Sequence, residues 1–185
     1  MSTKSSLAAA VLGAALVAGA SGQAQQAPAP ALPASPPANP LDNVPDKMPF
    51  DVPYGAPISL ARATAAIAAA AAEAKKHDWK LDIAVVDSGG NLVAFERMDG
   101  AQLASIQIAE HKARASATFR RETKAFENAI QQNGANYVMT LDGVVGSRGG
   151  IPLIEAGKLI GAIGCSGGTG SQDEVACKAG AATVK

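Results

Sequence analysis

The feature that most constrains the fold is a pair of short apolar segments, each folded back on itself by a turn. Residues 81–87 (LDIAVVD) predict a buried strand, residues 92–98 (LVAFERM) predict its return strand, and the SGGN between them predicts a hairpin turn. Glycine and asparagine tolerate the positive φ values that such turns require. Residues 151–155 and 159–165 repeat this arrangement around residues 156–158. Because hairpins join antiparallel neighbours, we expect an antiparallel sheet.

Helical segments flank the two hairpins. Alanine occupies nearly every face of residues 60–77, which Ser59 can N-cap, so this helix is expected to pack closely on more than one side. Further helices are expected over residues 102–121, 122–133 and 173–183. Ser171 or Gln172 can cap the last of these helices. The order α-β-β-α-α-β-β-α with hairpin connections indicates the α+β class, with a central antiparallel sheet and helices packed on its faces.

The N-terminal third of the chain predicts export. Residues 1–24 are typical of a signal peptide, because Lys4 precedes the uncharged apolar run 7–19. Small residues then provide two alternative cleavage sites, after residue 20 or after residue 24. The apolar run is shorter than the roughly 20 residues of a membrane-spanning helix, so we expect a periplasmic or secreted protein without stable membrane insertion after cleavage. Residues 25–57 contain ten of the 11 prolines and predict an extended tether. Residues 58–185 then form one domain.

Composition and charge exclude one class of partner. The 16 basic and 16 acidic residues balance, and no basic run is interleaved with aromatic residues, so we expect no nucleic-acid binding. The chain has only four Phe, two Tyr and one Trp, so its core depends on Ile, Leu, Val and closely packed Ala and Gly.

The two cysteines, Cys165 and Cys177, allow one intramolecular pairing. Export places them in an oxidising compartment, where disulfides persist, and this favours a disulfide between them. Two buried free thiols are the alternative. A structural zinc site is disfavoured, because two ligands with no third or fourth ligand nearby fit such a site poorly.

Four sequence segments of the domain form a specific combination through their order and spacing. They are IAVVDSGGNLVAFERMDGA (83–101), HKARASATF (111–119), GGIPL (149–153) and GAIGCSGGTGSQDEVACKAG (161–180). Together they resemble the haem-binding GlcG/HbpS family, whose domain also forms the C-terminal part of PduO-type cobalamin adenosyltransferases. The resemblance covers residues 58–185, essentially the whole domain.

The resemblance implies a fold and a function. Its fold is a profilin-like sandwich, in which helices cover a central antiparallel sheet, and its members assemble as homo-oligomers. It implies haem binding, and together with the expected signal peptide it predicts an exported haem-binding protein that acts as a carrier, a buffer or a redox-linked sensor. Two alternatives stay open: a non-catalytic accessory subunit of a periplasmic redox enzyme, and an enzyme acting on a small hydroxy acid. The sequence contains no recognisable catalytic constellation, which favours a binding protein over an enzyme.

The resemblance also points to candidate ligand-binding residues. His111 lies in the signature helix and is the best candidate for the iron ligand, because histidine is a common axial ligand of haem. Its alternative role is that of a surface helix residue. Arg97 and Lys112 are expected to pair with the haem propionates or with another small anionic ligand, near Asp99. Alternatively, Arg97 forms a structural ion pair and Asp99 caps the following helix.

Two residues depart from the family pattern. The chain has Ala115 where threonine is usual in the signature helix, so Ser116 or Thr118 would have to supply a hydroxyl near the iron. It also has Cys165 where an aliphatic residue is usual. Together with Cys177, this residue indicates a disulfide-bearing subset of the family.

Overall fold

The computed structural model describes residues 44–185. The expected signal peptide (1–24) and the first part of the expected tether (25–43) lie outside the described residues. The elements are α1 (Leu60–Lys76), β1 (Asp82–Asp87), β2 (Leu92–Arg97), α2 (Ser105–Thr118), α3 (Lys124–Gln131), the 3-10 helix η2 (Asn136–Thr140), β3 (Gly150–Glu155), β4 (Lys158–Ser166) and α4 (Gly170–Ala181). No helix within residues 44–185 has both the length and the apolar character needed to cross a membrane.

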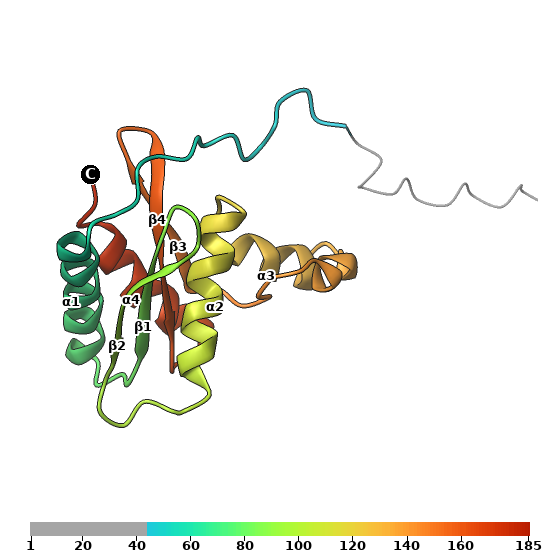
Figure 1. Ribbon diagram of the computed structural model, residues 1–185. Coiled ribbons are helices and arrows are strands. Elements are labelled where there is room, and N and C mark those ends of the chain that lie inside the picture. The colour runs from blue at the N-terminus through green and yellow to red at the C-terminus, as the bar shows by residue number, and fades with distance from the viewer. Residues whose placement is uncertain (1–43) are drawn as a thin grey trace, which may run out of the picture. The chain divides into compact units, whose positions relative to one another are not determined.

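The four strands form one antiparallel sheet in the order β2-β1-β4-β3. Both predicted hairpins, β1–β2 and β3–β4, are therefore confirmed. The central pair joins strands that are far apart in the sequence, with Ile83 opposite Cys165 and Val85 opposite Ile163. The helices cover both faces of this sheet (Figure 1), so the predicted α+β sandwich is confirmed.

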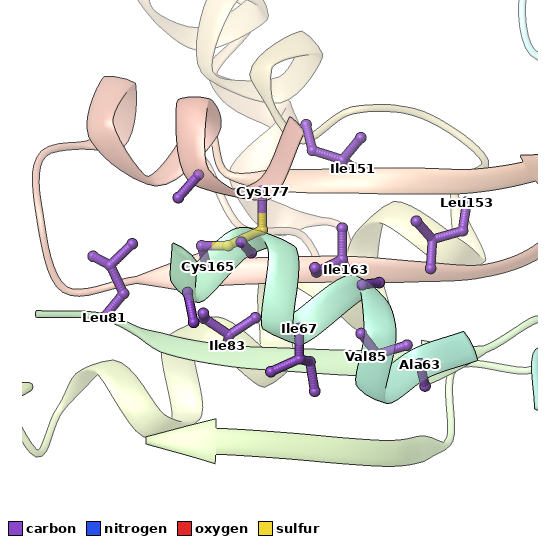
Figure 2. Close-up of a cluster of buried hydrophobic side chains, with 14 of the residues drawn as sticks. Ala63, Ile67, Leu81, Ile83, Val85, Ile151, Leu153, Ile163, Cys165 and Cys177 are labelled. Carbon is purple, nitrogen blue, oxygen red and sulfur yellow. A yellow bond between two sulfur atoms is a disulfide. The ribbon is translucent and has the colours of Figure 1, made fainter. Parts of the chain in front are cut away.

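The two faces of the sheet have different cores. On one face, α1 and α4 pack against the larger apolar side chains of the strands (Figure 2). This cluster includes Ile67, Ala70, Leu81, Ile83, Val85, Ile151, Leu153, Ile163 and Ala176. On the other face, α2 packs against a cluster built mostly of small side chains, namely Ala84, Val86, Ala109, Ala113, Ala117, Leu159 and Ala162. The alanine-rich composition thus allows helices to lie close to both faces.

Helix α2 touches the backbone of the sheet directly. A Cβ built on Gly164 in β4 would overlap the backbone of Ala109 and would lie 2.5 Å from the backbone nitrogen of Ala113. Real Cβ atoms essentially never approach another atom so closely. Glycine at position 164 is therefore required for α2 to occupy its present place.

The chain just before α1 is bonded to the domain. The amide of Leu159 donates to the carbonyl of Pro53 (2.8 Å), and the amide of Gly55 donates to the carbonyl of Leu159 (2.7 Å). The guanidinium carbon of Arg121 lies over the ring of Phe50, 3.2 Å from the ring centre. The last residues of the proline-rich segment thus run alongside the start of β4.

The observed N-cap is the predicted one in α1 but a different residue in α4. Ser59 caps α1 as predicted, since its hydroxyl accepts from the amide of Arg62. The prediction that Ser171 or Gln172 caps the last helix is wrong. Thr169 is the N-cap of α4, and Gln172 completes a capping box with it. The helix begins at Gly170 because this reciprocal pair satisfies its first amides.

Asp82 is an unexpected buried charge at the start of β1. Its side chain is 0% exposed, and neither carboxylate oxygen has a hydrogen-bond partner among the described residues. Burial raises the pKa of this carboxyl, and Arg97, its neighbour across the β1–β2 pair, opposes the rise. Ionising Asp82 therefore costs more free energy in the folded protein than in the unfolded chain.

Replacing Asp82 by asparagine is expected to raise the free energy of unfolding near pH 7, because the wild type must ionise a buried carboxyl there and the variant does not. Because the pKa is raised in the folded state, the wild type loses stability as the pH rises from the unfolded value of about 3.9 through the folded value. Asparagine stays neutral, so the advantage should vanish below about pH 4. Urea unfolding at both pH values measures this, with the exposed Asp51→Asn as control. An equal gain at both pH values would contradict the ionisation argument.

Candidate functional site

Helix α2 sends its polar side chains in two opposite directions. His111 and Arg114 are exposed on its outer side, whereas Lys112, Ala115 and Ser116 are buried. Residues three apart on a helix are neighbours on one face, and the adjacent residue points elsewhere. The predicted site residues His111 and Lys112 therefore lie on different sides of the same helix turn.

The outer side of α2 borders a surface hollow with a volume of about 400 Å³. Its lining consists of two residues of α2 and four consecutive residues of the loop that follows η2. They are His111, Arg114, Asp142, Gly143, Val144 and Val145. An imidazole can bind a metal ion, and a guanidinium can bind a carboxylate. The two valines add apolar surface beside these groups.

Arg114 and the loop residues were not predicted from the sequence. The signal for Arg114 was present, because a residue three positions after His111 on a helix shares its face. The loop from Asp142 to Val145 carries no such signal. Its place beside α2 depends on packing between segments that are distant in the sequence.

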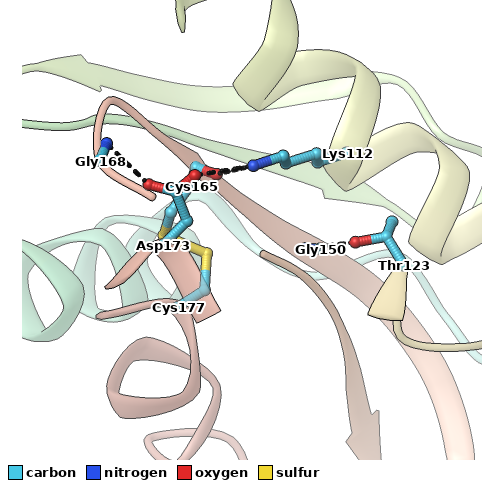
Figure 3. Close-up of a disulfide and its surroundings, with 7 residues drawn as sticks. All are labelled: Lys112, Thr123, Gly150, Cys165, Gly168, Asp173 and Cys177. Carbon is cyan, nitrogen blue, oxygen red and sulfur yellow. Dashed lines mark hydrogen bonds and ion pairs between the residues drawn. A yellow bond between two sulfur atoms is a disulfide. The ribbon is translucent and has the colours of Figure 1, made fainter. Parts of the chain in front are cut away.

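Lys112, a predicted ligand-binding residue, lies in the interior of the protein. Its side chain is 1% exposed, and its Nζ donates to Oδ2 of Asp173 at 2.8 Å and to the carbonyl oxygen of Cys165 at 3.1 Å (Figure 3). The other oxygen of Asp173 accepts from the amide of Gly168 at 3.0 Å. Burial raises the pKa of Asp173, and the Lys112 ammonium opposes that rise. The positive charge predicted to face a ligand is thus paired in the interior, where it joins α2 to α4.

The remaining predicted site residues lie in other places. Ser116 is buried, and its hydroxyl donates to the carbonyl of Arg121 at 2.9 Å. Arg97 and Asp99 line a second hollow of about 280 Å³ together with Lys75, Lys80, Glu96 and Met98. Asp99 does not cap the following helix, since Ala104 occupies the N-cap position of α2 and no side chain caps it. The structure therefore brings none of the four other predicted binding residues into the hollow beside His111.

The predicted disulfide is present. Cys165 at the end of β4 is bonded to Cys177 in α4, with their Cα atoms 5.7 Å apart (Figure 3). Both side chains are fully buried in the cluster under α1 and α4. Because the carbonyl of Cys165 also accepts from Lys112, the disulfide and the buried ion pair hold the same end of β4.

Known proteins resemble this chain in sequence and in fold. A family model described as "haem degrading protein HbpS-like" matches residues 58–182. The GlcG protein of Escherichia coli strain K12 is 42% identical over 94 residues, which cover 51% of this chain and 69% of GlcG. A solved double mutant of Streptomyces reticuli HbpS has a TM-score of 0.66 and 28% identity, covering 77% of this chain and 97% of that one.

A crystal structure of a PduOC:haem complex is also similar, with a TM-score of 0.63 and 25% identity. The match covers 70% of this chain and 96% of that chain. The family model spans more than half of the sequence, and the solved relatives share the arrangement of helices and sheet. The protein therefore belongs to the HbpS-like family, the GlcG/HbpS family that its sequence motifs predict.

Proposed function

We propose that this protein binds haem in the hollow between α2 and residues 142–145, with His111 as the protein ligand of the iron. The observation that carries this proposal is the exposed imidazole of His111 in the wall of a hollow of about 400 Å³. Small-molecule sites commonly have volumes of roughly 300–1,000 Å³. A haem bound there would supply an iron centre capable of electron transfer or oxygen chemistry.

The residues in the hollow fit such a ligand. Haem needs an axial donor, an apolar wall for the macrocycle and cations for its carboxylates. His111 provides the donor, Val144 and Val145 provide apolar surface, and Arg114 provides the cation. His111 and Arg114 are both exposed on this side of α2, so a ligand can reach their side chains from solvent.

The relatives support haem as the ligand class. The matching family is described as haem degrading, and PduOC was crystallised as a haem complex. These descriptions apply to the relatives themselves. Their agreement with the donor set in the hollow is the reason for preferring haem over another small anionic ligand here.

We propose that the protein is exported to the periplasm or secreted, forms a homo-oligomer, and serves as a haem carrier, buffer or redox-linked sensor. The disulfide between Cys165 and Cys177 supports export, because disulfides persist in oxidising compartments. The sequence of residues 1–24, typical of a signal peptide, supports the same location.

Replacing His111 by alanine is expected to abolish or strongly weaken haemin binding, because the iron loses its protein ligand. A haemin titration followed by Soret absorbance measures this, and we expect saturation in the micromolar range for the wild type. His77→Ala is the matched control, because His77 stacks on Trp79 and does not line the hollow. A Soret shift that survives His111→Ala would exclude this ligand, and no saturable shift in the wild type would exclude haem binding.

A further inference from the structure

Arg114 is held in a defined orientation by the β1–β2 turn. Its Nε donates to the carbonyl oxygen of Gly90 at 3.2 Å. Gly90 has a φ of +81°, and a Cβ added there would lie 3.2 Å from both Cγ of Arg114 and Cγ2 of Thr118. The aliphatic part of the Arg114 side chain thus packs directly on the backbone of Gly90. A larger residue at position 90 would push this side chain away.

The turn is itself held by one carboxylate. Oδ1 of Asp87 accepts from the amides of Gly89 (2.8 Å) and Asn91 (2.9 Å), and the amide of Gly90 donates to the carbonyl of Asp87 at 3.0 Å. Desolvation raises the pKa of Asp87, but the hydrogen bonds from Asn91 and Gly89 outweigh it and lower the pKa. The carboxylate therefore stays ionised and keeps the carbonyl of Gly90 in place for Arg114.

The outer edge of the Arg114 guanidinium is open to a ligand. No carboxylate of residues 44–185 lies within 4.0 Å of its nitrogens, although most other arginines of this part of the chain stand against a carboxylate or an aromatic ring. Its Nε donates to the carbonyl of Gly90, which leaves Nη1 and Nη2 as two neighbouring donors on a side chain that lines the hollow. Two such donors match the two oxygens of a carboxylate.

We infer that Arg114 is the carboxylate anchor of the hollow, and that the turn from Asp87 to Asn91 is a positioning element for it. The inference rests on the proposed function and specifies it further: the ligand is a porphyrin that carries a free carboxylate. His111 and Arg114 lie one helix turn apart, so the ring centre and a peripheral carboxylate of one ligand are bound by the same helix.

The test uses a porphyrin without iron, so that binding does not depend on His111. Protoporphyrin IX and its dimethyl ester, in which both carboxylates are blocked, are titrated into the purified protein and followed by porphyrin fluorescence. For the free acid, we expect Arg114→Gln to weaken binding by about tenfold or more, since a charge-assisted bidentate contact is lost. For the ester, wild type and variant should bind equally. Arg62→Gln, which removes one surface charge outside the hollow, should leave both affinities unchanged.

Asp87→Ala tests the positioning element. If the turn positions Arg114, this variant lowers the preference for the free acid over the ester. A variant that merely damages the fold weakens both porphyrins alike and leaves that preference unchanged, which would overturn the positioning role. Equal binding of the free acid by wild type and Arg114→Gln would overturn the anchor while leaving haem binding intact. No saturable binding of either porphyrin, together with no haemin shift, would overturn both proposals.

Discussion

Replacing Asp173 by alanine is expected to lower the free energy of unfolding by about 3–5 kcal/mol. The substitution leaves the ammonium of Lys112 buried without its anion, in a place where its side chain is 1% exposed. It also removes the acceptor for the amide of Gly168. Urea unfolding followed by circular dichroism measures the loss.

Two controls separate the buried pair from charge in general. Glu122→Ala breaks the half-exposed pair with Lys178 and should change stability by no more than about 1 kcal/mol. The double replacement Lys112→Met with Asp173→Leu should recover much of the loss, because no unpaired charge stays buried. If Asp173→Ala proves as mild as Glu122→Ala, the interior pair is not a major determinant of stability.

Replacing both Cys165 and Cys177 by alanine is expected to lower the free energy of unfolding by about 3 kcal/mol. The bond closes a loop with a sequence separation of 12 and so restricts the unfolded chain. Thermal unfolding with and without a reductant measures the effect, since the reductant should lower the melting temperature of the wild type only. A melting temperature of the double variant equal to that of the wild type would argue against this contribution.

The disulfide and the ion pair are not expected to act independently. The carbonyl of Cys165 accepts from Lys112, so both interactions hold the end of β4. Neighbouring sites that share a partner commonly show coupling of about 0.5–3 kcal/mol. The triple variant of Cys165, Cys177 and Asp173 should therefore deviate from the sum of the separate losses.

The parts of the fold that the sequence predicts well are those determined by local patterns. Apolar runs bounded by glycine turns indicate both hairpins, and Asp87 stabilises its turn as such a residue commonly does. Ser59 and the alanine-rich run after it indicate α1. The disulfide was predictable because only two cysteines exist in the chain. In each case the relevant residues are close in sequence or have no competitor.

The parts that could not be predicted depend on contacts between distant segments. The pairing of β1 with β4 joins two hairpins, and nothing in either hairpin specifies the other. Lys112 has the charge and the helix position of a ligand-binding cation, but its partner Asp173 is 61 residues away. The N-cap of α4 is a different case, because Thr169 with Gln172 and Ser171 with Glu174 are two local capping patterns and only the first is used.

The two walls of the hollow differ in how far they can adjust to a ligand. One wall is α2, which is fixed by its contact with Gly164, and the other is the loop of residues 142–145. Helix α2 lies directly on the strand backbone, so it cannot move toward the sheet to make room for a ligand. The opposite wall contains Gly143, where an added Cβ would meet no other atom within 4 Å. A ligand wider than the hollow must therefore displace the loop. Ligands of different width should share one binding pose on the helix and differ in the conformation they select for residues 142–145.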